Sequence, residues 1–297
     1  RVGQQARDGD LHVEGLEGQV LEAGGVGGER AEAGVGVGLG GEGRGEAGVN
    51  SFALISDLHS NLEAVTAVLQ RIDGLGVREI ACLGDVVGYG PDPLPVTMLV
   101  MQRCKWTIQG NHDWGLFHEL DDFNPLARDA LFYTRNQLRP GFLRPRRRAA
   151  WEFLRGLPER MEAHGFLFCH GSPRDPVMEY VLKSDGFLEP DKMAQLFALL
   201  DRPCFVGHTH WPGVHGPDYR FTQATDEHAS FRLQGPCIVN VGSVGQPRDG
   251  DPRASFAVVD GDRVEIHRVA YDFRRTQAKI HAAGLHPALA ERLARGK

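Results

Sequence analysis

The sequence predicts an α/β fold built on mixed β-sheets. Short apolar, β-branched runs alternate with segments of helical periodicity over the first half of the chain, which is typical of a sheet covered by helices. The later apolar runs lie closer together without long helices between them, so part of the sheet should be antiparallel or mixed. Ligands of such sheets gather beyond the carboxyl ends of the strands, and the polar residues there are the candidates for a functional site.

Eight runs are expected to form the strands, because each is rich in β-branched or aromatic residues and all but the last end in polar residues or glycine. They are residues 51–57 (SFALISD), 79–85 (EIACLGD), 105–111 (KWTIQGN), 166–171 (FLFCHG), 204–210 (CFVGHTH), 237–243 (CIVNVGS), 255–260 (SFAVVD) and 263–269 (RVEIHRV). The last two flank Gly261, which predicts a hairpin.

A helix is expected between the first two strands. Its start is indicated by Ser60 and Glu63, which have the spacing of a capping box. Its buried face is indicated by apolar residues at helical spacing, namely Leu62, Val65, Val68, Leu69 and Ile72. Further helices are expected at residues 92–103, 125–138, 146–155, 190–200 and 275–294.

Residues 1–50 differ in composition from the rest of the chain. They hold 16 Gly and no Phe, Tyr, Trp or Ile, so ordering them would bury too little to offset the lost entropy. We expect a Gly-rich disordered segment. The missing initiating Met favours a start site assigned too far upstream, with a genuine Gly-rich tail as the alternative. Residues 51–297 are expected to form a single domain, with C-terminal helices from about residue 275.

Charge argues against a nucleic-acid polymer as partner. Residues 1–50 carry 4 Arg against 9 Asp plus Glu, a net of −5, so the remainder holds only −1 of the total of −6. Broad nucleic-acid binding needs a basic face, and a near-neutral body does not supply one. One local cluster of arginines is an exception to this near-neutral charge. We expect it to form a solvated loop and the start of a helix, with contact to an anionic substrate as the alternative. It comprises Arg139, Arg144, Arg146, Arg147 and Arg148.

The five cysteines are scattered and show no CxxC spacing, which indicates small buried side chains in a reducing compartment. No segment combines a basic start with an apolar stretch, and no run is long enough to span a bilayer. We therefore expect a cytoplasmic protein with no membrane partner.

Polar residues follow five of the expected strands. Taken singly, each could cap a helix, close a turn or lie on a polar surface. A lone H-x-H motif fits ordinary histidines about as well as a metal site. In an extended strand, residues i and i+2 point to one side, so His208 and His210 are expected to point to one place. Five such strand ends together favour a metal site. The residues are Asp57, His59, Asp85, Asn111, His112, His170, His208 and His210.

The ordered motifs D-x-H, G-D, G-N-H-D, H-G and G-H-T-H resemble those of the calcineurin-like metallophosphoesterase family, over residues 52 to about 270. The resemblance implies two β-sheets packed as a sandwich between helices, a four-layer α-β-β-α fold. It also implies two divalent metal ions at one edge of that sandwich. Ions in such sites lie about 3.5–4 Å apart.

Carried over residue by residue, the resemblance assigns Asp57, His59 and His210 to the first ion. It assigns Asn111, His170 and His208 to the second ion, and Asp85 would bridge the two. The mixture of nitrogen and oxygen donors favours Mn²⁺, with Fe, Zn²⁺ or Ni²⁺ as alternatives, over Mg²⁺ or Ca²⁺.

The resemblance implies hydrolysis of a phosphate ester by in-line attack of a hydroxide held between the ions. His112 would assist the leaving group, with Asp113 as its orienting partner. The stretch "GDVVGYGPDP" lacks the Asp-Arg-Gly turn of the protein phosphatases, which argues against protein phosphatase activity. It resembles instead the bacterial small phosphodiesterases and dinucleoside polyphosphate hydrolases.

Two arginines are candidates for binding a second phosphate of a small phosphorylated substrate. They are Arg174 and Arg248, and the alternative for each is a salt bridge with the following Asp175 or Asp249. Two further functions stay open. One is a phosphomonoesterase or Ser/Thr protein phosphatase, and the other is a non-catalytic scaffold of the same fold.

Overall fold

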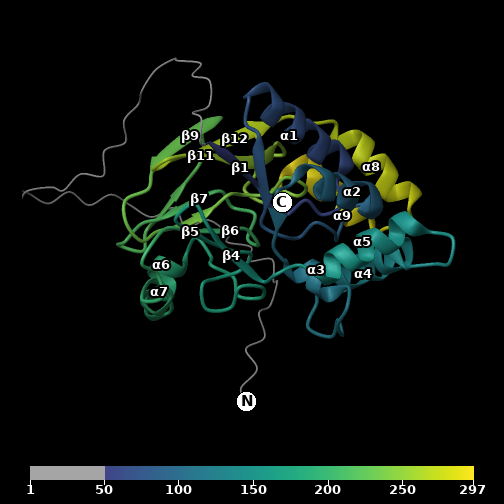
Figure 1. The fold of residues 1–297 in the computed structure, drawn as a ribbon, viewed down its shortest axis with the longest axis horizontal. Coiled ribbons are helices and arrows are strands. Elements are labelled where there is room, and N and C mark those ends of the chain that lie inside the picture. Colours follow the sequence, from purple (N-terminus) through teal and green to yellow (C-terminus); the bar gives the residue numbers. More distant parts are fainter. Residues whose placement is uncertain (1–50) are drawn as a thin grey trace, which may run out of the picture. The chain divides into compact units, whose positions relative to one another are not determined.

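Two six-stranded sheets lie face to face in the part of the chain that the computed structural model describes, residues 51–297 (Figure 1). The expectation for residues 1–50 falls outside those residues. Both sheets mix parallel and antiparallel pairs, and helices cover their outer faces. The predicted α/β sandwich of two mixed sheets flanked by helices is therefore confirmed.

The first sheet has its parallel strands on one side and its antiparallel strands on the other. Strand β1 pairs in parallel with β2, and β2 with β3, whereas β11, β12 and β9 add antiparallel neighbours. The order is β3 (Trp106–Thr107), β2 (Glu79–Cys82), β1 (Phe52–Ile55), β11 (Ala254–Asp260), β12 (Arg263–Val269) and β9 (His228–Arg232). All four residues of β1 are buried, as expected for a strand covered on both faces.

The second sheet is built in the same way around three parallel strands. Strands β5, β6 and β10 are parallel, and antiparallel strands complete both edges. The order is β4 (Arg160–Ala163), β5 (Phe166–Cys169), β6 (Cys204–Val206), β10 (Ile238–Asn240), β7 (Gly213–His215) and β8 (Phe221–Gln223). The core between the two sheets includes the fully buried side chains of Leu54, Phe168, Phe205 and Val259.

Helices form the two outer layers. Apolar contacts place four helices with the first sheet, namely α1 (Leu62–Gly74), α2 (Pro93–Arg103), α4 (Pro125–Leu138) and α5 (Pro145–Arg155). They place α7 (Pro190–Phe197) with the second sheet, and the short α6 (Asp185–Leu188) contacts α7. The C-terminal helices α8 (Phe273–Ala282) and α9 (Pro287–Arg295) pack on α4 and on each other. None of the described helices combines the length and the apolar character needed to cross a bilayer.

Two predicted helix boundaries are wrong for local reasons. The N-cap of α1 is Asn61, whose side chain accepts a hydrogen bond from the amide of Ala64 at 3.2 Å. Ser60 has a φ of 56° and does not cap, and Glu63 binds Lys279 of α8 instead of closing a capping box. The expected helix over residues 275–294 is two helices, because Gly284 turns with a φ of 71° and Pro287 begins α9.

Candidate metal centre

The loops that follow β1, β2, β3, β5 and β6 bring the expected polar residues together. These strands are parallel neighbours within their sheets, so their carboxyl ends lie at one edge of the sandwich. The side chains that meet there are all buried. They are Asp57, His59, Asp85, Asn111, His112, His170, His208 and His210.

The backbone at this edge is unusual. Strand β6 ends at Val206, so the expectation of a strand over residues 204–210 is wrong, and the two histidines lie in the loop beyond it. His208 has a φ of 67° and His210 a φ of 61°. Asp57, His59 and Asp85 also have positive φ values. Left-handed conformations of non-glycine residues cluster at functional sites, where the surrounding structure holds them.

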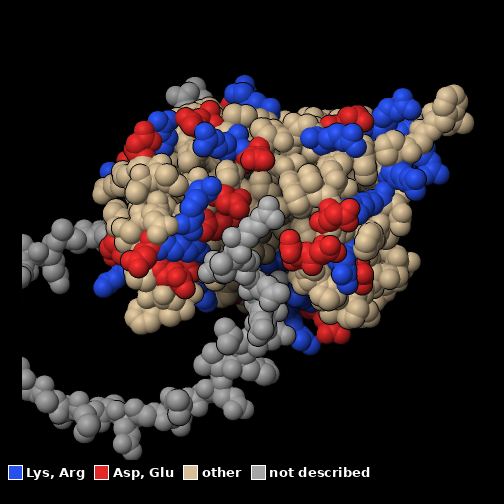
Figure 2. Space-filling model, turned by 90° about the horizontal axis from the view of Figure 1, so that it is seen from below, with Lys and Arg blue, Asp and Glu red and all other residues tan. Residues whose placement is uncertain are grey.

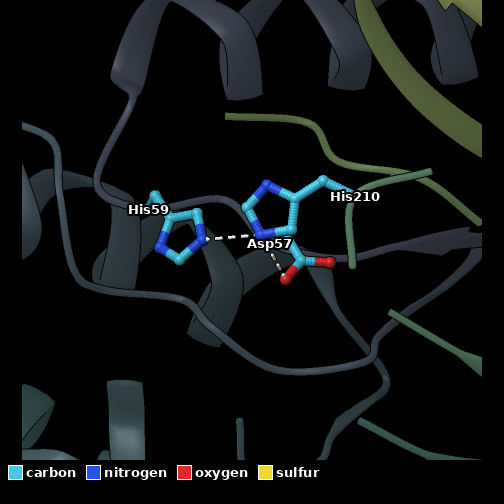
Figure 3. Close-up of side chains that lie close together, drawn as sticks. All are labelled: Asp57, His59 and His210. Carbon is cyan, nitrogen blue, oxygen red and sulfur yellow. Dashed lines mark hydrogen bonds and ion pairs between the residues drawn. The ribbon is translucent and has the colours of Figure 1, made fainter. Parts of the chain in front are cut away.

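The first group of donors comes from β1 and β6 (Figure 3). Nε2 of His210 lies 3.1 Å from Oδ1 of Asp57 and 3.2 Å from Nε2 of His59. The carboxylate of Asp57 also accepts the backbone amide of His208 at 3.1 Å, which fixes its orientation. Asp57, His59 and His210 can therefore share one cation.

The second group lies beside the first. Nε2 of His170 is 3.4 Å from Oδ2 of Asp85 and 3.3 Å from Oδ1 of Asn111. The rings of His170 and His208 have their centroids 4.9 Å apart, and Asp85, His170 and His208 offer ligand atoms within 4.8 Å of one another. Oδ2 of Asp85 also lies 3.6 Å from Nε2 of His59, so this carboxylate stands between the two groups.

Backbone carbonyls hold the far side of each imidazole. Nδ1 of His59 faces the carbonyl of Val87, that of His170 faces Leu83, and that of His210 faces Gln246. His208 is turned round, because its Nε2 faces the carbonyl of Met178 at 3.1 Å. A carbonyl can only accept, so each of these nitrogens carries a proton. In the neutral rings of His59, His208 and His210 the other nitrogen then presents its lone pair to the centre. Metal-bound histidines have this outer arrangement.

The electrostatics suit a cation. Burial lowers the pKa of His208 to about 3 and also lowers the pKa values of His59 and His210, so these rings are neutral. Burial alone would raise the pKa of Asp85, but the neighbouring histidines outweigh it and keep that carboxyl ionised. For His170 burial is outweighed by Asp85 and Asp57, which raise its pKa to about 10.

This donor set fits divalent metal ions. The neutral rings of His59 and His210 direct lone pairs at each other and at the Asp57 carboxylate over about 3 Å, an arrangement that is repulsive unless a positive charge lies between them. Within the described residues, the proton of His170 is the positive charge nearest to Asp85. Bound cations would replace that proton, because ligands must be deprotonated to coordinate.

Glycine is required where the backbone passes closest to the carboxylates. A Cβ at Gly110 would lie 2.2 Å from Oδ1 of Asp85. A Cβ at Gly207 would lie 2.1 Å from Oγ of Ser56 and 2.6 Å from Oδ2 of Asp57. Neither position can take a side chain without displacing a predicted ligand.

His112 lies beside the two groups at the start of α3 (Asn111–Gly115). Its backbone amide donates to Oδ1 of Asp85 at 2.8 Å, while its buried Nδ1 has no hydrogen-bond partner among residues 51–297. The ring packs on Tyr89, with centroids 4.6 Å apart, and burial lowers its pKa to about 4. His112 also offers a nitrogen within 4.8 Å of ligand atoms of His59 and Asp85.

Asp113 supports the backbone rather than the His112 ring. Its carboxylate accepts the amides of Gly110, Val86 and Val87 at 3.1–3.3 Å. Burial and the charge of Asp85 raise the pKa of Asp113 to about 7. Its hydrogen bonds therefore tie the loop after β2 to the start of α3.

The two candidate phosphate-binding arginines differ in their surroundings. Arg174 binds the carboxylate of Glu179 and the Oε1 of Gln195. The alternative expectation, a salt bridge between Arg174 and Asp175, is therefore wrong. Arg248 lies near the centre, because it donates to Oε1 of Gln246 at 3.0 Å and the carbonyl of Gln246 faces His210. Its charge helps to lower the pKa values of His112 and His210. Its guanidinium lies 5.7 Å from the Tyr89 ring centroid. Asp249, the expected alternative partner of Arg248, binds Arg268.

Sequence patterns gave no indication of the residues that hold His208. Met178 contributes only its carbonyl oxygen, which any residue could supply. Tyr180 stacks on the His208 ring with centroids 3.7 Å apart. Tyr180 is separated from His208 by 28 residues in the sequence and follows no recognisable motif of the site, so no pattern connects the two.

A four-layer α/β sandwich that gathers Asp, Asn and His donors at one edge defines a metallophosphoesterase. Comparison with known proteins agrees. The chain belongs to the calcineurin-like phosphoesterase superfamily, because the model of that superfamily domain matches residues 51–263.

Relatives match the described part almost end to end. A metallophosphoesterase from Sphaerobacter thermophilus of known crystal structure is 38% identical, with a TM-score of 0.71 over 83% of this chain and 99% of that one. A hypothetical protein from Pyrococcus horikoshii OT3 shares the fold at 20% identity, with a TM-score of 0.64 over 83% and 98% of the two chains. The uncharacterized protein MJ0912 of Methanocaldococcus jannaschii is 34% identical over 260 residues, which are 83% of this chain and 98% of that protein.

Proposed function

We propose that the protein is a phosphoesterase that depends on two divalent metal ions and hydrolyses a phosphodiester or a dinucleoside polyphosphate. The observation that carries this proposal is the buried centre itself. Seven donor side chains converge there, and the far nitrogen of each of its four imidazoles faces a backbone carbonyl. A scaffold without catalysis would not need this buried, aligned set of donors.

The donors divide into two sets. Asp57, His59 and His210 would hold one ion. Asn111, His170 and His208 would hold the other, and Asp85 would contact both. When bound, the ions would neutralise charge on the phosphoryl oxygens and make water a good nucleophile near neutral pH. Mn²⁺ is the proposed ion, because the donors mix imidazole nitrogen with carboxylate and amide oxygen.

His112 is proposed to act on the leaving group. Its backbone amide is bonded to Asp85, so the ring stands next to the bridging carboxylate, and Tyr89 and Phe123 pack against it. The ring would stand within reach of the departing oxygen. It would first have to take up a proton, which the neighbouring Asp85 carboxylate favours, and would then give that proton to the departing oxygen. General acid–base assistance of this kind contributes about 10²–10⁴-fold in rate. Asp113 is proposed to support this position through the backbone amides that it binds.

Arg248 is proposed to bind a second phosphate or the far side of the diester. It donates to Gln246, whose carbonyl faces His210, and its guanidinium lies 5.7 Å from the ring centroid of Tyr89, which packs on His112. Arg174 is a weaker candidate because it would have to leave Glu179. A contact for a second phosphate, together with the absence of the Asp-Arg-Gly turn, favours diesters over monoesters. Phosphomonoesters and phosphoproteins are the second substrate class to test.

The test compares the loss of a proposed metal ligand with the loss of the proposed leaving-group residue in one experiment. His208→Ala removes a proposed ligand, whereas His112→Ala removes the proposed leaving-group residue. His118→Ala, an exposed histidine outside the centre, is the matched control. Metal content per chain and turnover are measured with Mn²⁺ on bis(p-nitrophenyl) phosphate, p-nitrophenyl phosphate and a dinucleoside tetraphosphate.

The expected results separate binding from chemistry. His208→Ala should lose metal and activity together, and the control should keep both. His112→Ala should keep its metal but lose about 10²-fold or more of kcat, and less with an acidic leaving group that needs no protonation. If His112→Ala loses metal as His208→Ala does, His112 is a ligand and its assigned role is wrong. An unmodified protein that binds two metals per chain but turns over none of the esters would favour the scaffold.

A further inference from the structure

The connection between α4 and α5 carries an exposed apolar pair within a group of arginines. Phe142 is 94% exposed and Leu143 is 84% exposed, and we call these two residues the apolar tip. Figure 1 shows this connection projecting at the right-hand edge of the molecule, and Figure 2 shows Lys and Arg gathered around a protrusion at the same end. The surrounding arginine collar consists of Arg139, Arg144, Arg146, Arg147 and Arg148.

The positive charge of the collar is not balanced nearby. Residues 130–151 contain six arginines and no Asp or Glu. Within the described part of the chain, none of the collar arginines forms an ion pair with a carboxylate. Arg147 donates to the backbone carbonyl of Asn136 at 3.4 Å. The chain thus concentrates one sign of charge in a stretch whose nearest carboxylates in the sequence, Asp129 and Glu152, form no ion pair with the collar among the described residues.

Neither the tip nor the collar contributes visibly to folding. Arg146, Arg147 and Arg148 occupy the first turn of α5, where the helix dipole already carries positive charge and acidic residues would be favoured. The N-cap residue Arg144 makes no side-chain cap. Phe142 and Leu143 leave nearly all their apolar surface in water, and adjacent exposed apolar residues rimmed by charge are typical of interaction sites.

We propose that the apolar tip and the arginine collar dock on the surface of an anionic lipid bilayer. Phe142 and Leu143 would enter the interface between headgroups and acyl chains, and the collar would lie at the level of the lipid phosphates. Two weak signals of this kind, a short apolar insertion and a basic cluster, together give reversible peripheral binding. The proposal is independent of the chemistry at the metal centre. It departs from the expectation of no membrane partner, because that expectation considered only segments that span a bilayer and not surface docking.

The shape of the surface favours a bilayer over a macromolecule. A projecting tip offers no groove, and a fluid bilayer needs no preformed pocket to accept it. Proteins that bind single-stranded nucleic acid place flat aromatic platforms along a basic groove, whereas one of the two tip side chains here is Leu143, which cannot stack on a base. An acidic protein partner would need a matching cavity and is tested below.

The experiment measures partition of the full chain on sedimented vesicles of phosphatidylcholine, with and without phosphatidylglycerol. The protein should bind the anionic vesicles and bind less as NaCl is raised from about 0.05 M to about 0.5 M, because salt screens the collar. Phe142→Ser with Leu143→Ser should lower the partition coefficient about tenfold or more. Arg144→Gln, Arg146→Gln and Arg148→Gln together should lower it by a similar factor.

The matched control is Phe187→Ser with Leu188→Ser, an apolar pair on α6 that is 87% and 64% exposed. The sequence has no arginine between residues 175 and 201, so this pair has no collar of its own. It should bind vesicles as the unmodified protein does, and all variants should keep the unmodified melting temperature. The proposal is overturned if the unmodified protein ignores anionic vesicles, or if the tip variant binds as tightly as the control. It is also overturned if poly-glutamate or a single-stranded oligonucleotide is bound while vesicles are not.

Discussion

A buried ion pair holds the loop that carries Arg248. Asp249 binds the guanidinium of Arg268, and both side chains are only 2% exposed. The same loop contributes the carbonyl of Gln246, which accepts a hydrogen bond from His210. We predict that Asp249→Asn, which keeps the shape of the side chain and removes its charge, destabilises the protein and loosens the metal centre.

The magnitude follows from the burial of the pair. The substitution leaves the charge of Arg268 inside the protein with one fewer ionic partner, and its Nε already lacks a hydrogen-bond partner among the described residues. Breaking a buried pair in this way costs about 3–5 kcal/mol. For a domain of this size, 1 kcal/mol shifts the melting temperature by roughly 2–4 °C, so the melting temperature should fall by roughly 6 °C or more.

Differential scanning calorimetry on the metal-loaded protein measures this effect, with metal content determined in parallel. Asp201→Asn is the control, because its pair with Arg202 is exposed and should contribute nothing measurable. Asp249→Leu combined with Arg268→Met should recover most of the lost stability, since it removes both charges together. A fall of less than about 2 °C for Asp249→Asn would refute the reasoning, because it would mean that water reaches Arg268.

Three further predictions concern metal, the N-terminal segment and pH. Chelation should lower the melting temperature and abolish turnover, and Mn²⁺ should restore both more fully than Mg²⁺; full activity of a metal-free preparation would exclude the mechanism. Deleting residues 1–50 should leave stability and activity unchanged, because their composition offers few side chains to bury, and a loss of several degrees in the melting scan would contradict this. Burial opposes ionisation of Glu179, but hydrogen bonds from Arg174 and Ser172 outweigh it and lower its pKa. The stability that Glu179 contributes is therefore fully present above its unfolded pKa of about 4.3, and it is lost as the pH falls through the lower pKa of the folded protein. The variant Glu179→Gln should consequently lose less stability than the unmodified protein when the pH is lowered through this range.

The central strands could be predicted because their sequences are mostly apolar and their residues are mostly buried. Strands β1, β2, β5, β6 and β10 lie within predicted runs, and the hairpin of β11 and β12 turns at Gly261 as expected. Strand β9 was missed because it alternates exposed and half-buried residues, and β4 was missed because its residues are polar or only partly buried. Such edge strands gain their structure from the neighbour they pair with, so their own residues carry little signal.

The candidate ligands could be predicted from their place after strands, but their orientation could not. The expectation that His208 and His210 point the same way rested on a strand that ends before them. Their left-handed backbone turns them toward different donors, with His210 beside Asp57 and His208 beside His170. The carbonyls that fix the rings belong to Met178, Gln246, Leu83 and Val87, and a carbonyl is common to every residue.

The strain at the centre indicates which state the fold is built for. Six of the eight non-glycine residues with positive φ among residues 51–297 lie at this edge, namely Asp57, His59, Ser60, Asp85, His208 and His210. Each such conformation costs on the order of 1 kcal/mol or more, although Asp and His tolerate it better than most residues. The lone pairs of His59 and His210 add repulsion to that strain, since they face each other over 3.2 Å.

Cations would relieve the repulsion and tie the strained loops to one another. We therefore infer that the metal-loaded protein is the state in which these loops are stable, and that metal loss should loosen the loops after β1, β2 and β6 first. Hydrogen exchange with and without chelator would reveal this order. Uniform exchange across the whole domain would show instead that the loops are held by the protein alone.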